Sequence, residues 1–315
     1  MTSKQMKVSD LHPQVQKQVA RMPTISLRSP LSRMLMKSVM AIAFRSQADA
    51  NVRRHTVKLE HVSVRVYEPV SEHAGAGMLF IHGGGYVMGQ ARMNDPDCNR
   101  IVRELGMSVV SVDYRLAPKH PYPAPLDDCY KAWLWFLDNA ELMGVDPSRI
   151  VVAGQSAGGG LAAALCQRIL DEGAPQPAAQ LLYYPMIDDR TATRGDLTPV
   201  RHIAWNNENN FFGWSAYLGH PPDDGSEIPR WAVPSRRPDL SNLPPAWIGV
   251  GDKDLFYGEN LDYAERLSKD GVESELEIVE DVPHGFDALA PEADISRDFR
   301  EASFDFLRRR LGIDS

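Results

Sequence analysis

A serine between two glycines is the first feature of this sequence that could carry out chemistry. Ser156 lies in the run GQSAG at 154–158, directly after the apolar run IVVA and directly before LAAALCQRIL, which has a helical pattern. A serine on a sharp strand-to-helix turn has an exposed hydroxyl group, and its neighbours must be small to avoid clashes. The alternative is a glycine-rich helix start that binds phosphate, but the lysine of a GxxxxGK[ST] motif does not follow. The context therefore predicts that Ser156 is a nucleophile.

A serine hydroxyl needs a base that takes its proton, and the chain has nine histidines. His284 follows the last strand-like run in the segment EDVPHGF, so we expect it at the carboxyl end of a strand, as we do Ser156. The order serine, acid, histidine then places the acid after AWIGVG at 246–251, where Asp252 and Asp254 occur. Either carboxylate could orient the imidazole, and we favour Asp254. A single aspartate there could instead cap the next helix.

Three consecutive glycines follow His82, although each glycine loses more conformational freedom on folding than any other residue. Bare backbone N–H groups can stabilise the oxyanion that forms when a serine attacks an ester carbonyl. We expect Gly83, Gly84 and Ala157, the residue after the nucleophile, to supply these donors. His82 is expected to pack and to hold the loop rather than to act as the base.

The elements that would position these residues alternate between strands and helices. The alternating pattern at 57–67 indicates half-buried antiparallel strands. Continuous apolar runs, typical of strands buried in a parallel sheet, follow it, with helical patterns between them. This order predicts an α/β fold with a mostly parallel central sheet flanked by helices. The apolar runs lie at 78–82, 107–114, 149–154, 179–185, 246–251 and 275–280, and the helical segments at 96–105, 126–140, 157–171, 257–269 and 294–311.

Two regions interrupt this alternation. The segment up to residue 50 carries a basic amphipathic pattern, and we expect it to bury its apolar side against the protein rather than to lie on a membrane surface. The segment 188–227 is an aromatic insertion that could be a local core, a lid over a pocket, or both. We expect Tyr184, Trp205, Phe211 and Phe212 to bind the substrate. The amphipathic pattern consists of Leu31, Met34, Leu35, Val39 and Ile42, with Arg33, Lys37 and Arg45 between them.

The composition argues against several classes of protein. The 34 basic and 42 acidic residues give a net charge of −8 without a basic stripe, so nucleic-acid binding is not expected. Three widely spaced cysteines (Cys98, Cys129 and Cys166) without a CxxC pair indicate neither a disulfide framework nor a zinc site. The N-terminus lacks the apolar core of a secretory signal, and no apolar run is long enough to span a membrane. We expect a cytoplasmic protein without stable membrane insertion.

Together these motifs resemble those of the hormone-sensitive-lipase-like (bacterial family IV) carboxylesterases of the α/β-hydrolase fold. The similarity is collinear over about 55–310. It implies that Ser156 is the nucleophile, Asp254 the acid and His284 the base. The motifs are HGGGY at 82–86, DYRLAP at 113–118 with HP at 120–121, GQSAGG at 154–159, GDKD at 251–254 with Glu259 and Tyr263-Ala264, and HGF at 284–286.

The resemblance also implies an organisation for the chain. A helical cap would be built from 1–50 and the insertion 188–227, and the α/β-hydrolase core from 51–187 and 228–315. Members of this family often form homodimers. The scheme requires a small ester substrate and neither a metal nor an organic cofactor.

Three departures from the family pattern leave the substrate open. Gln155 stands where many members have Asp or Thr, Leu255-Phe256 follow Asp254 in place of Pro-Leu, and Lys119 replaces a common Glu. We predict a serine carboxylesterase that acts on short-chain acyl or aryl esters. One alternative is an amidase or arylformamidase with the same triad. Another is a non-catalytic ligand-binding protein, like the related plant hormone receptors, which lack the catalytic histidine that this chain keeps as His284.

Overall fold

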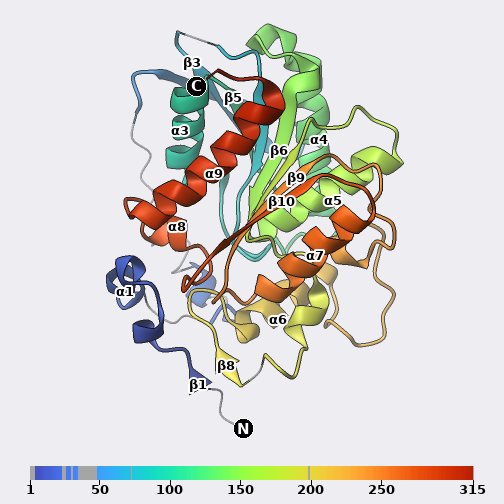
Figure 1. The fold of residues 1–315 in the computed structure, drawn as a ribbon. Helices are drawn as coiled ribbons and strands as arrows, with labels where there is room; N and C mark the ends of the chain where they lie inside the picture. The colour runs from blue at the N-terminus through green and yellow to red at the C-terminus, as the bar shows by residue number, and fades with distance from the viewer. Residues whose placement is uncertain are drawn as a thin grey trace.

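One central sheet of eight strands organises the computed structural model, which describes residues 4–22, 26–29, 31–34, 48–71, 73–197 and 199–314 (Figure 1). The strand order is β10-β9-β7-β6-β4-β5-β3-β2. β3 runs antiparallel to β2 and β5, and the other neighbours are parallel. The predicted fold class is therefore confirmed. The strands are β2 Val52–Lys58, β3 Ser63–Pro69, β4 Gly77–Ile81, β5 Ser108–Asp113, β6 Ile150–Gln155, β7 Gln180–Tyr183, β9 Ala246–Gly251 and β10 Ser274–Val279.

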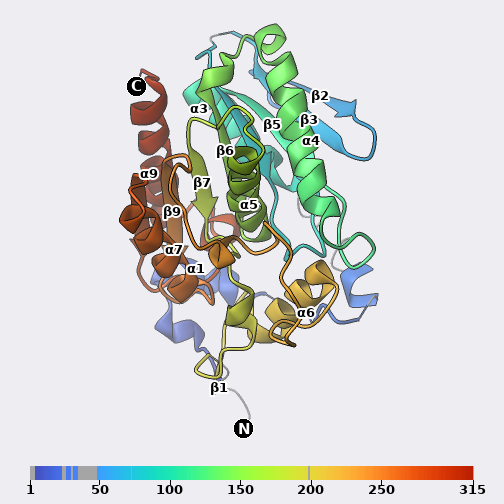
Figure 2. The same cartoon turned by 90° about the vertical axis from the view of Figure 1, so that its right-hand side faces the viewer.

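Helices cover both faces of this sheet (Figures 1 and 2). Side chains alternate between the faces of a strand, so Leu79 and Ile81 pack into one apolar core while Met78 and Phe80 pack into the other. α4, α5 and α7 contribute to the first core, and α3 and α9 to the second. Their bounds are α3 Asp95–Leu105, α4 Ala124–Asn139, α5 Ala157–Asp171, α7 Tyr257–Lys269 and α9 Asp294–Leu311.

The remaining elements lie around the carboxyl end of the parallel strands, in the lower and left parts of Figure 1. The N-terminal segment contacts the insertion there: β1 pairs with β8, and the Leu27 N–H donates to Asn209 Oδ1 at 2.9 Å. These elements are β1 Lys4–Gln5, α1 Pro13–Val19, β8 Val200–Arg201, α6 Asn207–Leu218 and α8 Phe286–Leu289. Short 3₁₀ turns occur at Val8–Asp10, Ala91–Asn94, Glu141–Met143, Pro147–Arg149, Asp189–Ala192 and Pro234–Arg236.

The amphipathic helix predicted before residue 50 falls largely outside the described residues. Residues 31–34 are helical, with Leu31 69% and Met34 63% exposed, and the later positions of the pattern lie outside the described ranges. Within those ranges, every helix is too short or too polar to cross a lipid bilayer. The same residues contain no group of three His, Cys, Asp or Glu side chains placed to hold a metal ion.

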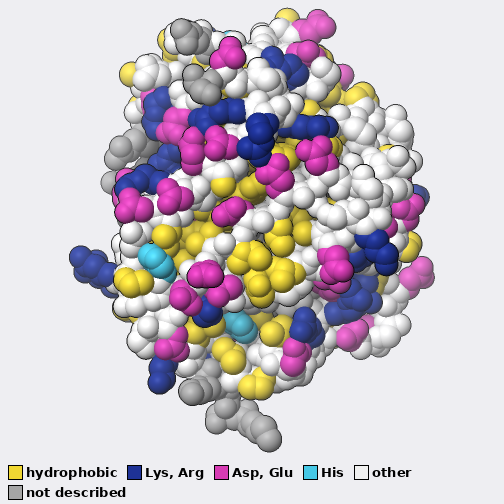
Figure 3. Space-filling model, viewed as in Figure 1, with side chains coloured by type: hydrophobic (Ala, Val, Ile, Leu, Met, Phe, Trp, Pro, Cys, Tyr) yellow, Lys and Arg dark blue, Asp and Glu magenta, His cyan; other side chains and the backbone are white. Residues whose placement is uncertain are grey.

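Acidic and basic side chains are interspersed over α9 on the face shown in Figure 3. Many of them form ion pairs with one another: Arg308 pairs with Glu301 and Asp305, and Arg309 pairs with Glu275 of β10. Exposed ion pairs of this kind contribute little to stability. Hydrophobic side chains gather lower on the same face, toward the carboxyl end of the sheet.

Candidate active site

Ser156 occupies a strained turn between β6 and α5. Its backbone has φ 54° and ψ −122°, a region that non-glycine residues rarely adopt. Three backbone hydrogen bonds hold the turn: the Ser156 N–H donates to Tyr183 O at 2.9 Å, and Ser156 O accepts from Gly160 and Met186, both at 3.0 Å. The backbone N–H and C=O of Ser156 are thus satisfied within the scaffold, which fixes the residue in the turn.

The glycines beside Ser156 are required by close backbone contacts. A Cβ on Gly154 would lie 2.2 Å from Gly158 O, and one on Gly158 would lie 2.1 Å from Ile81 O. Both contacts are with backbone atoms, so the clash could not be relieved by the movement of a flexible side chain. The strand, the turn and the helix can therefore approach one another only with hydrogen in place of a side chain at these positions.

Three side chains from three separate loops form one hydrogen-bonded chain. His284 Nδ1 lies 2.7 Å from Asp254 Oδ2, and His284 Nε2 lies 2.9 Å from Ser156 Oγ. All three residues are buried. Because an ionised carboxylate only accepts hydrogen bonds, the proton of the neutral imidazole belongs on Nδ1, and Nε2 is then free to accept the serine proton.

Asp254 and Asp252, the two carboxylates left open by the sequence, have different partners. Asp254 uses Oδ2 for His284, while its Oδ1 accepts the Phe256 N–H at 2.9 Å at the start of α7. Asp252 instead pairs with Lys253 Nζ at 2.7 Å and accepts the Asp281 N–H at 2.6 Å. The structure brings Asp254 to the histidine, and it places Asp252 in contacts that tie the loop after β9 to the loop after β10.

Aromatic rings restrict the orientation of His284. Tyr184 meets the imidazole edge to face at a centroid distance of 4.9 Å, and Phe256 does so at 5.1 Å. Trp205 of the insertion lies further away, at 6.5 Å and with a 41° tilt. The imidazole is therefore held between its two hydrogen-bond partners by packing as well as by polar contacts.

His82 lies at the same edge of the sheet but in a closed environment. It is fully buried and stacks on Tyr114 with a centroid distance of 4.2 Å. Its Nδ1 lies 2.8 Å from Gly83 O, and the Tyr114 hydroxyl donates to His82 O at 2.9 Å. Burial lowers the pKa of His82, so the neutral ring is favoured. These contacts fix the start of the glycine loop.

Each of the three positions after His82 requires glycine for a separate steric reason. A Cβ on Gly83 would lie 3.2 Å from the Cβ of Ser156. Gly84 has φ +122°, and a Cβ on Gly85 would lie 2.1 Å from the ring of Trp205. The loop therefore passes directly beside the serine. Within the described part of the chain, the N–H groups of Gly83, Gly84 and Ala157 donate to no backbone or side-chain acceptor.

A cavity of about 300 Å³ opens at Ser156 and His284. Tyr184 and Trp205 line it, as the sequence predicted, but Phe211 and Phe212 are not among its lining residues. α6 buries Trp214 and Tyr217 on its inner side, and the ring of Phe212 instead packs beneath Arg33 at 5.0 Å. The other lining residues are Gly83, Gly84, Gly85, Met88, Met93, Asn94, Pro96, Asp97, Gln155, Ala204, Asp287, Ala288 and Pro291.

Sequence reasoning missed two acidic residues of this cavity, Asp97 and Asp287. Asp287 is buried and accepts the Tyr184 hydroxyl at 2.9 Å. Burial, and then the charge of Asp97, raise the pKa of Asp287 to about 6. Asp97 lies in the first turn of α3, where an acidic residue is common near the positive end of a helix. One available signal was Gln155, a departure from the family pattern, whose side-chain nitrogen lies 3.4 Å from Asp97 Oδ2.

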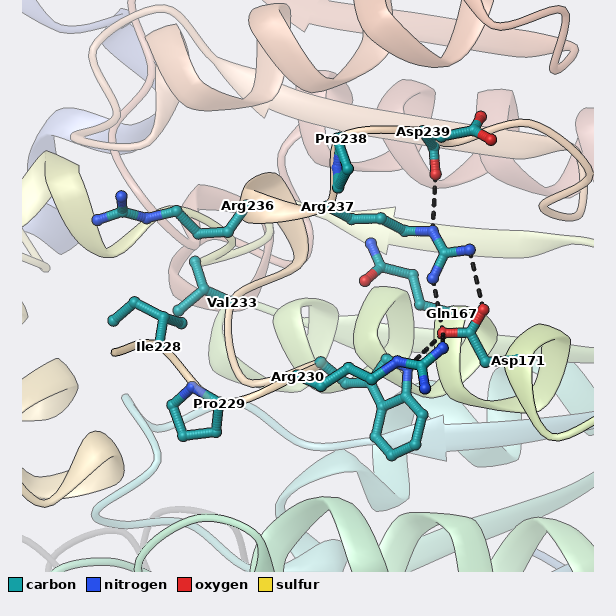
Figure 4. Close-up of a pocket in the computed structure, with 11 residues that line it drawn as sticks. Gln167, Asp171, Ile228, Pro229, Arg230, Val233, Arg236, Arg237, Pro238 and Asp239 are labelled. Carbon is teal, nitrogen blue, oxygen red and sulfur yellow. Dashed lines mark hydrogen bonds and ion pairs between the residues drawn. The ribbon is translucent and has the colours of Figure 1, made fainter. Parts of the chain in front are cut away.

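A second cavity, of about 340 Å³, lies at the other end of α5 (Figure 4). Asp171 accepts hydrogen bonds from Arg237 at 2.7 and 3.0 Å and from the Trp231 indole at 2.7 Å, and Arg230 lies 2.9 Å away. Arg236 is bound to the buried Asp189. The polar side chains around this cavity thus have partners within the protein, and none of the histidines or of the sequence-predicted site residues lines it.

Comparison with known proteins agrees with this geometry. Residues 78–288 match a family described by the alpha/beta hydrolase fold. Carboxylesterase NlhH of Mycobacterium tuberculosis (strain ATCC 25618 / H37Rv) is 38% identical over 232 residues, 72% of each chain. Ethyl acetate hydrolase of Pseudomonas putida is 31% identical over 234 residues, 71% of this chain and 70% of that protein. A solved bacterial heroin esterase has a TM-score of 0.89 at 33% identity and covers 97% of this chain and 99% of its own.

The chain therefore belongs to the α/β-hydrolase family. The carboxylesterase and the heroin esterase just compared are both esterases by name. Within the α/β-hydrolase family, the chain falls in the hormone-sensitive-lipase-like branch, which its motifs resemble.

Proposed function

We propose that this protein is a serine carboxylesterase that hydrolyses short-chain acyl or aryl esters through an acyl-enzyme intermediate. Ester hydrolysis itself follows from the family and its curated members. The hydrogen-bonded chain from Asp254 through His284 to Ser156 is the single observation that carries the proposed mechanism.

In the first half of the reaction, His284 Nε2 takes the proton of Ser156 Oγ as the oxygen attacks the carbonyl carbon. Asp254 stabilises the imidazolium that results. The carbonyl oxygen becomes an oxyanion, and the N–H groups of Gly83, Gly84 and Ala157 are the proposed donors to it. Collapse of this intermediate breaks the bond to the alcohol oxygen, which receives the proton from His284, and leaves the acyl group on Ser156.

In the second half, a water molecule replaces the alcohol. His284 takes a proton from the water as its oxygen attacks the acyl carbon, and the same N–H groups stabilise the second oxyanion. Release of Ser156 Oγ, with the proton returned by His284, gives the free acid. The scheme uses neither a metal ion nor an organic cofactor.

The size of the cavity supports short substrates. Its volume of about 300 Å³ lies at the lower end of the roughly 300–1,000 Å³ that ligand pockets occupy. Trp205 from the insertion packs against the glycine loop, so the insertion limits the space above the serine. We expect turnover to decline for acyl chains longer than about ten carbons, because such chains would outgrow a pocket at the small end of that range.

Contacts between separate segments support the proposed division into a cap and a core. The cap would comprise 1–50 and 188–227, and the core 51–187 and 228–315. Ser26 Oγ donates to Glu208 at 2.8 Å and the Leu27 N–H donates to Asn209, so the described part of the N-terminal segment rests on the insertion. A cytoplasmic location and a homodimer remain predictions; light scattering after size exclusion tests the dimer.

The test is hydrolysis of p-nitrophenyl acetate, butyrate, octanoate and palmitate by the wild type and by Ser156→Ala. We expect the wild type to cleave the short esters and the variant to lose this activity. Equal activity of the two proteins would overturn the proposed nucleophile. Matched anilides distinguish an amidase, since an amidase would cleave them at rates comparable to those of the esters.

A further inference from the structure

Three polar residues form a hydrogen-bonded group in the wall of the cavity beside Ser156, and a fourth, Asp287, lines the same cavity without a hydrogen bond to them. The amide nitrogen of Asn94 donates to Gln155 Oε1 at 2.7 Å and lies 3.3 Å from Asp97 Oδ2. Gln155 Nε2 lies 3.4 Å from the same Asp97 oxygen. Asp287 lines the cavity as well, and its nearest charged neighbours include Asp97. We refer to Asn94, Asp97, Gln155 and Asp287 as the acceptor group.

The charge of this wall is negative. Asp97 and Asp287 contribute two carboxylates, and no lysine or arginine is among the described residues that line the cavity. Arg100 and Arg300 do not line this cavity but lie behind the same two carboxylates, where all four residues line a small neighbouring space of about 20 Å³ and the charge of Arg300 partly offsets that of Asp287. Both arginines have partners elsewhere: Arg100 pairs with Glu104 at 3.6 Å, and Arg300 donates to Pro291 O at 2.8 Å.

Asn94 offers an acceptor without a donor. Its side chain is buried, with the residue 4% exposed, and its Oδ1 has no hydrogen-bond partner among the described residues. Most buried acceptors in proteins have a hydrogen-bond donor as partner. An amide oxygen can only accept a hydrogen bond, so the group it lacks is a donor; this oxygen is enclosed by protein, and the carboxylates of the wall, rather than Asn94 Oδ1, are the acceptors that can face a bound group.

The same cavity has an aromatic wall. Tyr184 and Trp205 both line it, and Tyr184 donates its hydroxyl to Asp287, which brings the ring next to the carboxylate. Aromatic faces attract cations, most strongly where water is excluded. The combination of two carboxylates and two aromatic rings in one wall is suited to a cationic group that carries N–H donors.

We propose that the ester hydrolysed here carries a protonated amine, which binds between Asp97 and Asp287 against Tyr184 and Trp205. This inference rests on the proposed ester hydrolysis and names the substrate class of the same site. An ammonium ion placed there would relieve the repulsion between the two carboxylates and donate hydrogen bonds to them. An ester with a free carboxylate at the same place would be repelled.

The test compares esters that differ only in charge. Dimethylaminoethyl acetate and isoamyl acetate have the same shape with and without an ammonium group in the alcohol part, and ethyl dimethylaminobutyrate and ethyl isoheptanoate do the same for the acyl part. The measured quantity is the ratio of kcat/KM within each pair, from acid release near neutral pH at low salt. We expect a preference of at least about tenfold for the ammonium ester in one of the pairs.

Three variants connect that ratio to the carboxylates. Asp97→Asn and Asp287→Asn should each lower the ammonium preference by about threefold or more, and the use of a ratio removes any general change in activity. Glu292→Gln is the matched control, because this exposed acid follows the lining residue Pro291 but does not itself line the cavity. It should leave the ratio unchanged. Asp97 is only partly buried, so its variant remains informative if Asp287→Asn fails to fold.

The outcomes separate this proposal from the proposed function. If isoamyl acetate and ethyl isoheptanoate are cleaved and neither pair shows a preference, ester hydrolysis stands and the ammonium proposal is wrong. A preference that persists in both Asp97→Asn and Asp287→Asn also overturns it. If none of the four esters and no p-nitrophenyl ester is cleaved, the proposed function itself fails.

Discussion

The two cavities at opposite ends of α5 have similar volumes, about 300 and 340 Å³, but they use their polar groups differently. At the far end, Asp171 binds Arg230, Arg237 and Trp231, so its hydrogen-bonding capacity is used within the protein. At the Ser156 end, backbone donors and a buried acceptor are left without partners in the described part of the chain. Unused hydrogen-bonding groups, rather than volume, distinguish the cavity that can act on a substrate.

The largest expected effect concerns Asp254. Asp254→Ala removes the carboxylate that holds His284 Nδ1, so the imidazole loses its tautomer and its charge stabilisation. We expect kcat to fall by roughly 10⁴-fold, as is typical for the acid of a triad. Asp252→Ala, which removes the neighbouring carboxylate without touching His284, is the matched control and should change kcat by less than about threefold. Similar losses in the two variants would contradict the assignment of the acid.

The glycine loop should show the next largest effect. In Gly83→Ala the new Cβ would lie 3.0 Å from Gln155 O and 3.2 Å from the Ser156 Cβ, so the loop must shift by a few tenths of an ångström. Because oxyanion donors act only at short range, we expect a loss of about 10²–10³ in kcat. At Gly195 an added Cβ meets nothing within 4 Å, and Gly195→Ala should retain full activity. Normal activity of Gly83→Ala would show that this loop does not bind the oxyanion.

Asp287 should affect stability with a characteristic pH dependence. Its pKa is raised from 3.8 to about 6, mainly by burial, so the folded state binds its proton more tightly than the unfolded chain does. The contribution of Asp287 to the stability of the wild type should therefore decrease as the pH rises from 3.8 to about 6, by up to about 3 kcal/mol. Asp287→Asn cannot ionise, so its advantage over the wild type in urea unfolding should grow across this window. A constant difference between pH 4 and 8 would contradict an ionised, buried Asp287.

The far cavity should show the smallest effect on activity. Arg237, followed by Trp231 and Arg230, holds the pKa of Asp171 down to about 2, and its stabilising contribution is complete above 3.8 and is lost as the pH falls toward 2. Asp171→Asn should lower the free energy of unfolding at neutral pH by about 1–2 kcal/mol and leave kcat/KM unchanged. Asp298→Asn, an exposed acid on α9, is the control for the lost charge. A large loss of activity in Asp171→Asn would show that the second cavity takes part in the reaction.

The sequence predicted the sheet and its helices well because their signals are local. The bounds of α5, α7 and α9 agree with the predicted segments, since each helix has its own apolar repeat and a definite end. The residues brought together at Ser156 were also accessible, because each follows a strand whose carboxyl end lies at the same edge of the sheet.

What the sequence did not reveal depends on the rotation of helices and on contacts between distant segments. Phe211 and Phe212 occur in the aromatic insertion as expected, but the sequence did not indicate which side of α6 faces the cavity. Asp97 and Asp287 lie far apart in the sequence, and each has an ordinary local interpretation when it is considered alone. Their proximity follows only from the fold, which brings the first turn of α3 and helix α8 to one small space.

The most direct test of the account is covalent labelling with diethyl p-nitrophenyl phosphate, which phosphorylates an activated serine, followed by mass spectrometry of the intact protein and its peptides. We predict one diethylphosphoryl group per chain on the peptide that contains Ser156, with no label on Ser156→Ala and very slow labelling of His284→Ala. Label on another residue of the wild type, or undiminished label on Ser156→Ala, would contradict the role of Ser156 as the nucleophile.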